Sequence, residues 1–275
     1  MVAQRHGRGG AVFASMAMAG VVATAGGCSG DGGAAADDRP RLDAAAVRKV
    51  ADVLLASGSS RARTSMEMAV GGTRVTIRGE GGYDFGKRMG RLRVVLPKDP
   101  SGSDEHRPIT ELLSPGALYM KNRGAGVPDN KWVRVDSATV DDGNLVTGGA
   151  TDPLTAAELL RTATRVTFVA EQDLAGVRVW HFRGVTDIRR AATVASPYAR
   201  GALTAAARGF AEDAVPFDAY LDDAGRLRKV RHRFSYVNQG HAVAVSSTTL
   251  LYAFGERVEV TLPPGGDIYD GEIKS

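Results

Sequence analysis

Residues 61–77, RARTSMEMAVGGTRVTI, decide the fold because their side chains alternate between two faces at every second position. One face of 61–70 takes the methionines, threonine and valine, and the other takes the arginines, serine and glutamate. Gly71-Gly72 signals a two-residue hairpin turn, and Val75 and Ile77 continue the alternation on the return strand. This period of two predicts an antiparallel hairpin with one dry face and one wet face.

The same alternation recurs in both halves of the chain and predicts about ten strands. Those that follow the hairpin in the first half are 89–96, 117–121 and 131–135. Those in the second half are 165–170, 177–184, 215–221, 226–237, 242–254 and 257–262. Strands joined by short turns pair as antiparallel neighbours, and the twist that accumulates over so many strands makes the sheet curl. We therefore expect a curved sheet with a concave face.

Three other segments have helical character. Residues 42–57 place leucines and valines at helical spacing. Asp152-Pro153 opens a second helix, with the aspartate as N-cap and the proline in the first turn. Residues 186–213 are alanine-rich and predict a helix that is broken or kinked at Pro197. The predicted fold class is α+β: a strongly curved antiparallel sheet of about ten strands with helices packed on its concave face.

The N-terminus has the layout of a secretory signal that ends at the only cysteine of the chain. Residues 1–8 are basic, 9–25 are apolar and small, and Gly26-Gly27 precede Cys28. This resembles a bacterial lipobox, with Ala25 where leucine is more usual, and predicts acylation of Cys28. The alternative is an uncleaved anchor helix, but the apolar stretch 11–25 is shorter than the roughly 20 residues that a span needs.

The chain therefore divides into a lipoprotein signal peptide (1–27), a lipidated cysteine with a flexible tether (28–40), a single folded domain (41–265) and a polar C-terminal tail (266–275). The tether is small and polar and has nothing to bury. Removing 1–27 takes away Arg5 and Arg8 and no acids, which leaves 33 basic and 31 acidic residues. This balance argues against a nucleic-acid partner. With Cys28 acylated no disulfide forms, and we favour a monomer.

The sequence shows no arrangement that indicates catalysis or metal binding. The histidines that follow the signal are isolated, and none belongs to an HxH or HExxH motif: His106, His181, His232 and His241. No GxSxG pentapeptide is present, and the aspartate pairs lie in polar turns or in the tether. We therefore expect a protein that is not an enzyme and has no metal site and no cofactor.

Arginines form the remaining pattern. They alternate on three successive strands, at 61, 63, 74, 78, 91 and 93, and five cations crowd residues 226–233. One interpretation is attraction to anionic lipid headgroups or wall polymers. The other, which the sequence alone favours, is a solvated outer face of the sheet.

A set of motifs resembles the actinobacterial LppX/LprAFG lipoprotein family over most of residues 42–265. In order, they are LYMK (118–121), KWV (131–133), DPL (152–154), LAGVRVWHFRGVT (174–186), VPFDAYLDDAGRL (215–227) and AFGERVEVTLP (253–263). The resemblance implies a LolA/LolB-like half-barrel in which an apolar cavity between sheet and helices holds the acyl chains of a lipid or glycolipid. It also implies a location on the outer face of the cell membrane, anchored by acyl groups such as palmitate, and a role in lipid transport within the envelope.

Carried over position by position, the resemblance places the cavity lining on the dry face of the strands and on two helices. The residues are Leu54, Met66, Met68, Val75, Ile77, Leu92, Val94, Leu159, Phe168, Trp180, Phe182, Phe217 and Phe234. The same apolar positions are equally typical of an ordinary core. The alternative function is therefore a surface-tethered interaction or sensor module with a filled core and no lipid ligand.

Overall fold

The computed structural model describes residues 42–70, 72–97, 107–124, 126–146, 150–238 and 241–271. The predicted signal peptide, Cys28 and the tether lie outside the described residues. Within the described part, no helix is long and apolar enough to cross a membrane. All described residues belong to the compact unit Pro40–Ser275.

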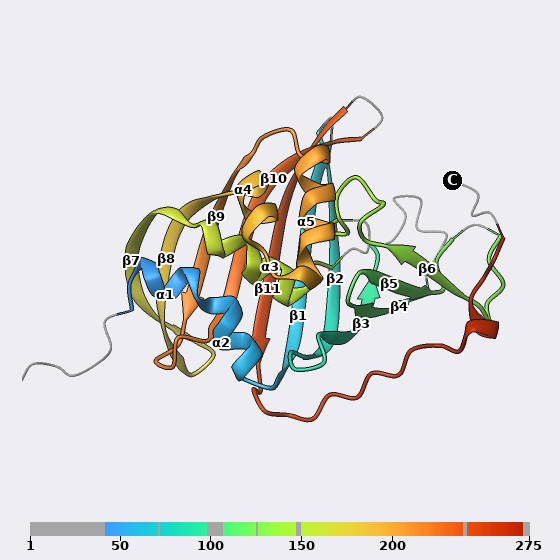
Figure 1. The fold of residues 1–275 in the computed structure, drawn as a ribbon, viewed down its shortest axis with the longest axis horizontal. Coiled ribbons are helices and arrows are strands. Elements are labelled where there is room, and N and C mark those ends of the chain that lie inside the picture. Colours follow the sequence, from blue (N-terminus) through green and yellow to red (C-terminus); the bar gives the residue numbers. More distant parts are fainter. Residues whose placement is uncertain are drawn as a thin grey trace, which may run out of the picture. The chain divides into compact units, whose positions relative to one another are not determined.

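Eleven strands form one open antiparallel sheet in the order β6-β5-β4-β3-β2-β1-β11-β10-β9-β8-β7 (Figure 1). Their bounds are β1 Ser59–Val70, β2 Thr73–Asp84, β3 Met89–Val95, β4 Ile109–Ser114, β5 Ala117–Lys121, β6 Trp132–Asp136, β7 Thr164–Leu174, β8 Val177–Asp187, β9 Ala214–Leu221, β10 Leu227–Asn238 and β11 His241–Tyr252. The pairing of β1 with β11 joins the two halves of the chain into one sheet. The predicted curved antiparallel sheet is confirmed, with eleven strands.

The central hairpin is present, and the apolar faces that its alternation predicted lie on the same side of the sheet. Met66 lies opposite Ile77 and Met68 opposite Val75, so apolar side chains meet across the β1–β2 pair. Met66 and Ile77 are buried, whereas Arg63 on the alternate face is exposed. One face of the sheet is therefore the core face along the whole hairpin.

Short helices cover the concave side of the sheet (Figure 1). They are α1 Ala44–Arg48, α2 Val50–Ala56, α3 Pro153–Leu159, α4 Ile188–Val194 and α5 Pro197–Gly209, with the 3₁₀ turn Leu160–Thr162 after α3. The carboxylate of Asp152 caps α3 by accepting the Leu154 N–H at 2.8 Å, as predicted. The predicted break at Pro197 separates α4 from α5. The opposite side of the sheet, which we call the helix-free face, carries none of these helices.

Three local predictions were wrong. The predicted helix 42–57 is two short helices, which a turn at Lys49 separates. Strand β4 (Ile109–Ser114) was missed because Leu112 and Leu113 are both buried, which hides the alternation. Residues 257–262 form no strand; the chain there runs on as an irregular segment to the 3₁₀ turn Gly265–Asp267 and pairs Ile268 with Trp132 in a single parallel bridge.

Candidate functional site

The residues predicted to line a lipid cavity lie mostly in the packed core between sheet and helices. Buried are Leu54, Met66, Ile77, Leu92, Val94, Leu159, Phe182 and Phe217; half-buried are Met68, Val75, Trp180 and Phe234. Leu54, Val94 and Phe217 have no accessible surface, so not even a water molecule fits beside them. Phe168, in contrast, is 56% exposed, and its ring meets the ring of Phe182 in an edge-to-face arrangement. The structure thus brings twelve of these side chains together, but it fills the space among the innermost ones.

An open hollow remains where this core reaches one end of the sheet; we call it the end groove. It has a volume of about 540 Å³ and lies between the strand ends of β1, β2 and β10 and the segment 139–146. Its lining consists of Met68, Ile77, Arg123, Thr139, Val140, Asp141, Asp142, Val146, Tyr236 and Val237. This volume is within the range of small-molecule sites, roughly 300–1,000 Å³. Its lining mixes aliphatic side chains with the charged groups of Arg123, Asp141 and Asp142, so it suits a ligand with an apolar part and a polar part.

Local hydrogen bonds hold the segment that covers the end groove. The carboxylate of Asp142 accepts the N–H groups of Asn144 at 3.0 Å and Val146 at 2.9 Å. Gly143 has a φ of +59°, and a Cβ there would lie 1.9 Å from the Ala202 carbonyl oxygen of α5. Only glycine permits this close approach, which seats the segment on α5. This segment could not be predicted from the sequence, because its fixed shape depends on contacts with α5.

A buried acid lies on the core face of β4. Glu111 sits between its strand neighbours Leu92 and Met120, and neither of its carboxyl oxygens has a hydrogen-bond partner among the described residues. Burial raises the pKa of Glu111 to about 8, although the nearby charge of Arg123 opposes the shift. Arg123 itself lines the end groove. The Glu111 carboxyl group is therefore neutral near pH 7.

A polar network joins the helices to one another and to the sheet. Arg161 donates to Glu158 at 2.7 Å and to Asp52 of α2 at 2.6 Å, and Glu158 also accepts the Ser196 N–H at 3.1 Å. Tyr83 of β2 lies 3.2 Å from Asp152 at the start of α3. Burial raises the pKa of Asp152, although the N–H groups that it caps oppose the shift. These contacts tie α2, α3 and the α4–α5 link together and fit a structural role.

The described histidines all lie on strands of the sheet. His232 is buried, and desolvation, with a smaller contribution from Arg233, lowers its pKa to about 4, so it stays neutral. His181 lies 2.8 Å from Asp218 and stacks on Tyr220. Among the described residues, no group of three or more His, Cys, Asp and Glu side chains could hold a metal ion. His241 is exposed, and His106 lies outside the described residues.

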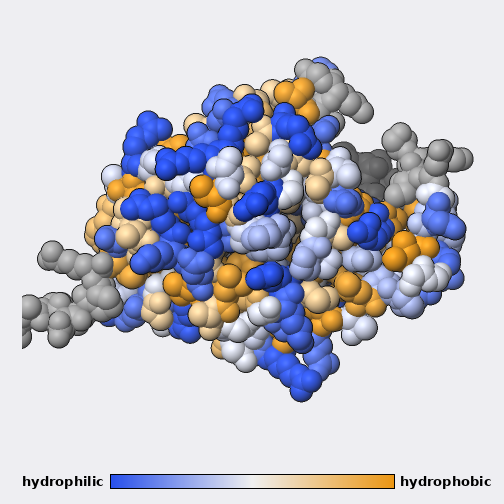
Figure 2. Space-filling model, in the orientation of Figure 1, coloured by the Kyte–Doolittle hydropathy of each residue, from blue (hydrophilic) through white to orange (hydrophobic). Residues whose placement is uncertain are grey.

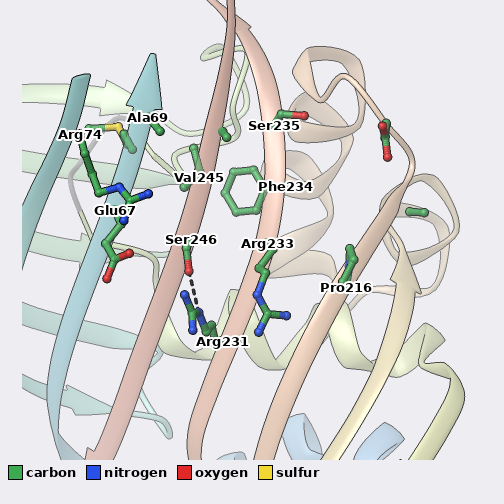
Figure 3. A pocket seen from close by; sticks show the side chains of 14 residues that line it. Glu67, Ala69, Arg74, Pro216, Arg231, Arg233, Phe234, Ser235, Val245 and Ser246 are labelled. Atoms are coloured by element: carbon green, nitrogen blue, oxygen red, sulfur yellow. Dashed lines mark hydrogen bonds between the residues drawn. The ribbon is translucent and has the colours of Figure 1, made fainter. Parts of the chain in front are cut away.

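The Asp218 carboxylate is an anionic centre on the helix-free face. Burial raises its pKa, but the hydrogen bonds from His181, Arg233 and Arg183 together outweigh burial and lower the pKa to about 2. Beside this centre lies a groove of about 460 Å³, with Arg231, Arg233, Glu67 and Arg74 at its rim (Figure 3). Figure 3 shows Phe234 at the bottom of this groove, between β10 and β11. On the helix-covered side, hydrophilic and apolar residues are interspersed (Figure 2).

No family model and no curated protein matches this sequence. The structure is similar to the lipoprotein LppX from Mycobacterium tuberculosis, with 10% identity over 79% of this chain and 97% of that one and a TM-score of 0.49. It is also similar to LprF from Mycobacterium bovis (11% identity, 81% and 97% covered, TM-score 0.42). A further neighbour is a putative outer membrane lipoprotein-sorting protein domain from Vibrio parahaemolyticus (9% identity, 78% and 95% covered, TM-score 0.30). The sequence motifs pointed to the LppX/LprAFG family, and the likeness to LppX and LprF concerns the fold alone.

Proposed function

We propose that this protein is a lipoprotein, anchored through acylated Cys28 to the outer face of the cell membrane, that binds an acyl chain of a lipid or glycolipid and carries it within the envelope. The observation that carries the proposal is the end groove, where the core-face side chains Met68 and Ile77 reach an open hollow that also has charged groups in its lining. An acyl chain would lie against Met68, Ile77 and Val146. The polar headgroup would stay at the rim near Arg123 and Asp141.

The energetics of transfer support such a groove. Each methylene that leaves a bilayer for water costs about 0.8 kcal/mol, and a dry wall offsets most of that cost. The filled core beyond Ile77 sets the depth to which a chain can enter without moving the helices. The groove is open to solvent, so a headgroup does not need to be desolvated.

The second candidate is the interaction or sensor module with a filled core. It is favoured by the absence of accessible surface at Leu54, Val94 and Phe217, the positions that a wide cavity would expose. The two candidates differ in whether lipid accompanies the folded protein. Native mass spectrometry of residues 31–275, which include all described residues, distinguishes them after expression in a lipid-containing host. A co-purifying phospholipid or acylglycerol mass supports carriage, whereas apo protein that takes up no lipid in exchange supports the module.

A charge placed in the end groove is expected to reduce lipid occupancy at least tenfold. Val237 lines the groove and is 55% exposed, so Val237→Asp leaves the core intact but obliges an acyl chain to desolvate a carboxylate. The matched control is Val194→Asp on α4, where the valine is 50% exposed. Lipid exchange with a fluorescent acyl probe measures the effect. Equal occupancy in the two variants would remove the end groove from the proposal.

Replacing the lipidation site tests the anchor. Cys28→Ser offers a hydroxyl in place of the thiol that accepts the diacylglycerol group, and no other cysteine can substitute for it. We expect the variant to lose tight membrane association, because two or three acyl chains provide the anchor. Fractionation with a carbonate or salt wash measures it. Membrane retention equal to that of the natural chain would contradict the anchor.

A further inference from the structure

The helix-free face concentrates positive charge on four strands near the middle of the sheet. Alternate residues of β3, β2, β1 and β10 present cations there, around β11, which contributes none: Arg91, Arg93, Arg74, Arg78, Arg61, Arg63, Lys229, Arg231 and Arg233. The same positions of these strands carry only three carboxylates, Glu67, Glu80 and Asp84. Figure 3 shows Arg74, Arg231 and Arg233 on the side of the sheet that faces away from the helices.

Most of these cations have no carboxylate counter-ion within the described part of the chain. Arg63 donates to Glu80 at 3.0 Å, and Arg233 donates to Asp218. Arg61 lies 3.8 Å from Glu256. The remaining six, Arg74, Arg78, Arg91, Arg93, Lys229 and Arg231, have no carboxylate partner among the described residues. The positive charge of this face is therefore available to an external anion.

The same face has an apolar floor between its cations. A second hollow of about 620 Å³ is lined by residues of β1, β2, β3, β10 and β11 and by Leu174 at the end of β7, next to the groove of Figure 3. Val95, Leu174 and Leu250 line it together with the cations Arg63, Arg78, Arg93 and Lys229. Val95 is 41% exposed. Cations around an apolar floor match the interface of an anionic bilayer, where phosphate groups lie above the first methylenes of the acyl chains.

We infer that the helix-free face docks on the anionic lipid surface of the membrane. Each cation close to such a surface contributes about 1 kcal/mol, and the contribution weakens with salt. Docking would orient the folded unit with its helices turned away from the lipid. The inference concerns headgroups in the bilayer, so it stands independently of acyl-chain binding in the end groove.

The test is vesicle co-sedimentation of the full chain carrying Cys28→Ser, so that acylation contributes nothing. Vesicles consist of phosphatidylcholine alone or of phosphatidylcholine mixed with phosphatidylglycerol. We expect binding to the anionic vesicles that salt weakens and that exceeds binding to the neutral ones. The triple variant Arg78→Gln/Arg93→Gln/Lys229→Gln should lower affinity for anionic vesicles on the order of a hundredfold.

The matched control removes the same charge from the helix-covered side. Arg190→Gln/Arg200→Gln/Arg208→Gln neutralises three exposed arginines of α4 and α5 and should retain the binding of the parent chain. Thermal melts establish that both triple variants are folded. Equal losses in the two variants, or equal binding to neutral and anionic vesicles, would overturn the inference. Binding to soluble polyphosphate without binding to anionic vesicles would also overturn it, because the partner would then be a wall-type polymer.

Discussion

Glu111→Gln is expected to raise the free energy of unfolding above pH 8 by about 5 kcal/mol and to flatten its pH dependence. In the native state the pKa of Glu111 is raised from 4.5 to about 8, chiefly by burial. Each unit of pKa difference between the folded and unfolded states corresponds to about 1.4 kcal/mol. Glutamine has nearly the same shape and carries no charge, so it removes the cost of burying a carboxylate.

The sign follows from the protons that each state binds. Below pH 4.5 both states are protonated, and Glu111 adds no pH dependence. Between pH 4.5 and about 8 the native state holds a proton that the unfolded state has released, so stability falls as pH rises. Above pH 8 the carboxylate is charged in both states, and the stability that falls over this pH range has been lost completely. Below pH 5 the glutamine variant should therefore be close to the natural chain in stability.

Urea unfolding at intervals from pH 5 to pH 9 measures the effect. Glu67→Gln is the matched control, because Glu67 lies on the helix-free face with no hydrogen bond among the described residues. The control should keep the pH profile of the natural chain. A Glu111→Gln variant with that same profile would show that Glu111 is ionised or solvated in the native state.

Phe217→Ala is expected to lower the free energy of unfolding by about 3–5 kcal/mol. Phe217 has no accessible surface, and a Cβ on its sheet neighbour Gly184 would lie 2.8 Å from its ring. Removing the ring leaves a cavity. The neighbouring residues are already closely packed and cannot shift enough to fill it. If Phe217 bordered an empty lipid cavity, fewer contacts would be lost, and the destabilisation would be correspondingly smaller.

Phe168→Ala is the matched control, since the resemblance assigned both phenylalanines to the same cavity lining. Because Phe168 is 56% exposed, its truncation to alanine should lower the free energy of unfolding by less than about 1 kcal/mol. Chemical denaturation of both variants at one pH measures the difference. Similar losses in the two would contradict the packing described for Phe217. Uptake of a hydrocarbon by the Phe217→Ala variant would show that the loss of one side chain turns the filled interior into a binding cavity.

The sheet was largely readable from the sequence. The period of two in 61–77 predicted β1, β2 and the apolar face of each strand, and the structure adds the register that pairs Met66 with Ile77. The break before Pro197 was readable for a local reason, since proline restricts the residue before it. In contrast, β4 could not be predicted, because Leu112 is buried on the face where alternation requires a polar residue.

For the candidate site, the sequence indicated some of the residues that line it but not how they are arranged in space. The resemblance named Met68 and Ile77, which line the end groove, but not the segment 139–146 that covers it. That segment depends on the contact of Gly143 with α5, which is distant in the sequence. The raised pKa of Glu111 was equally hidden, because desolvation comes from neighbours on other strands.

The sequence by itself determined which face of each central strand is apolar, where the proline breaks the second pair of helices and where the only cysteine lies. These are local properties, set by the spacing of side chains along one segment. Only the tertiary structure decided that the space around Leu54, Val94 and Phe217 is filled and that a groove stays open beside Met68. The physical reason is that the volume left between sheet and helices depends on the distances and rotamers of many segments at once, and no periodicity within one segment records it.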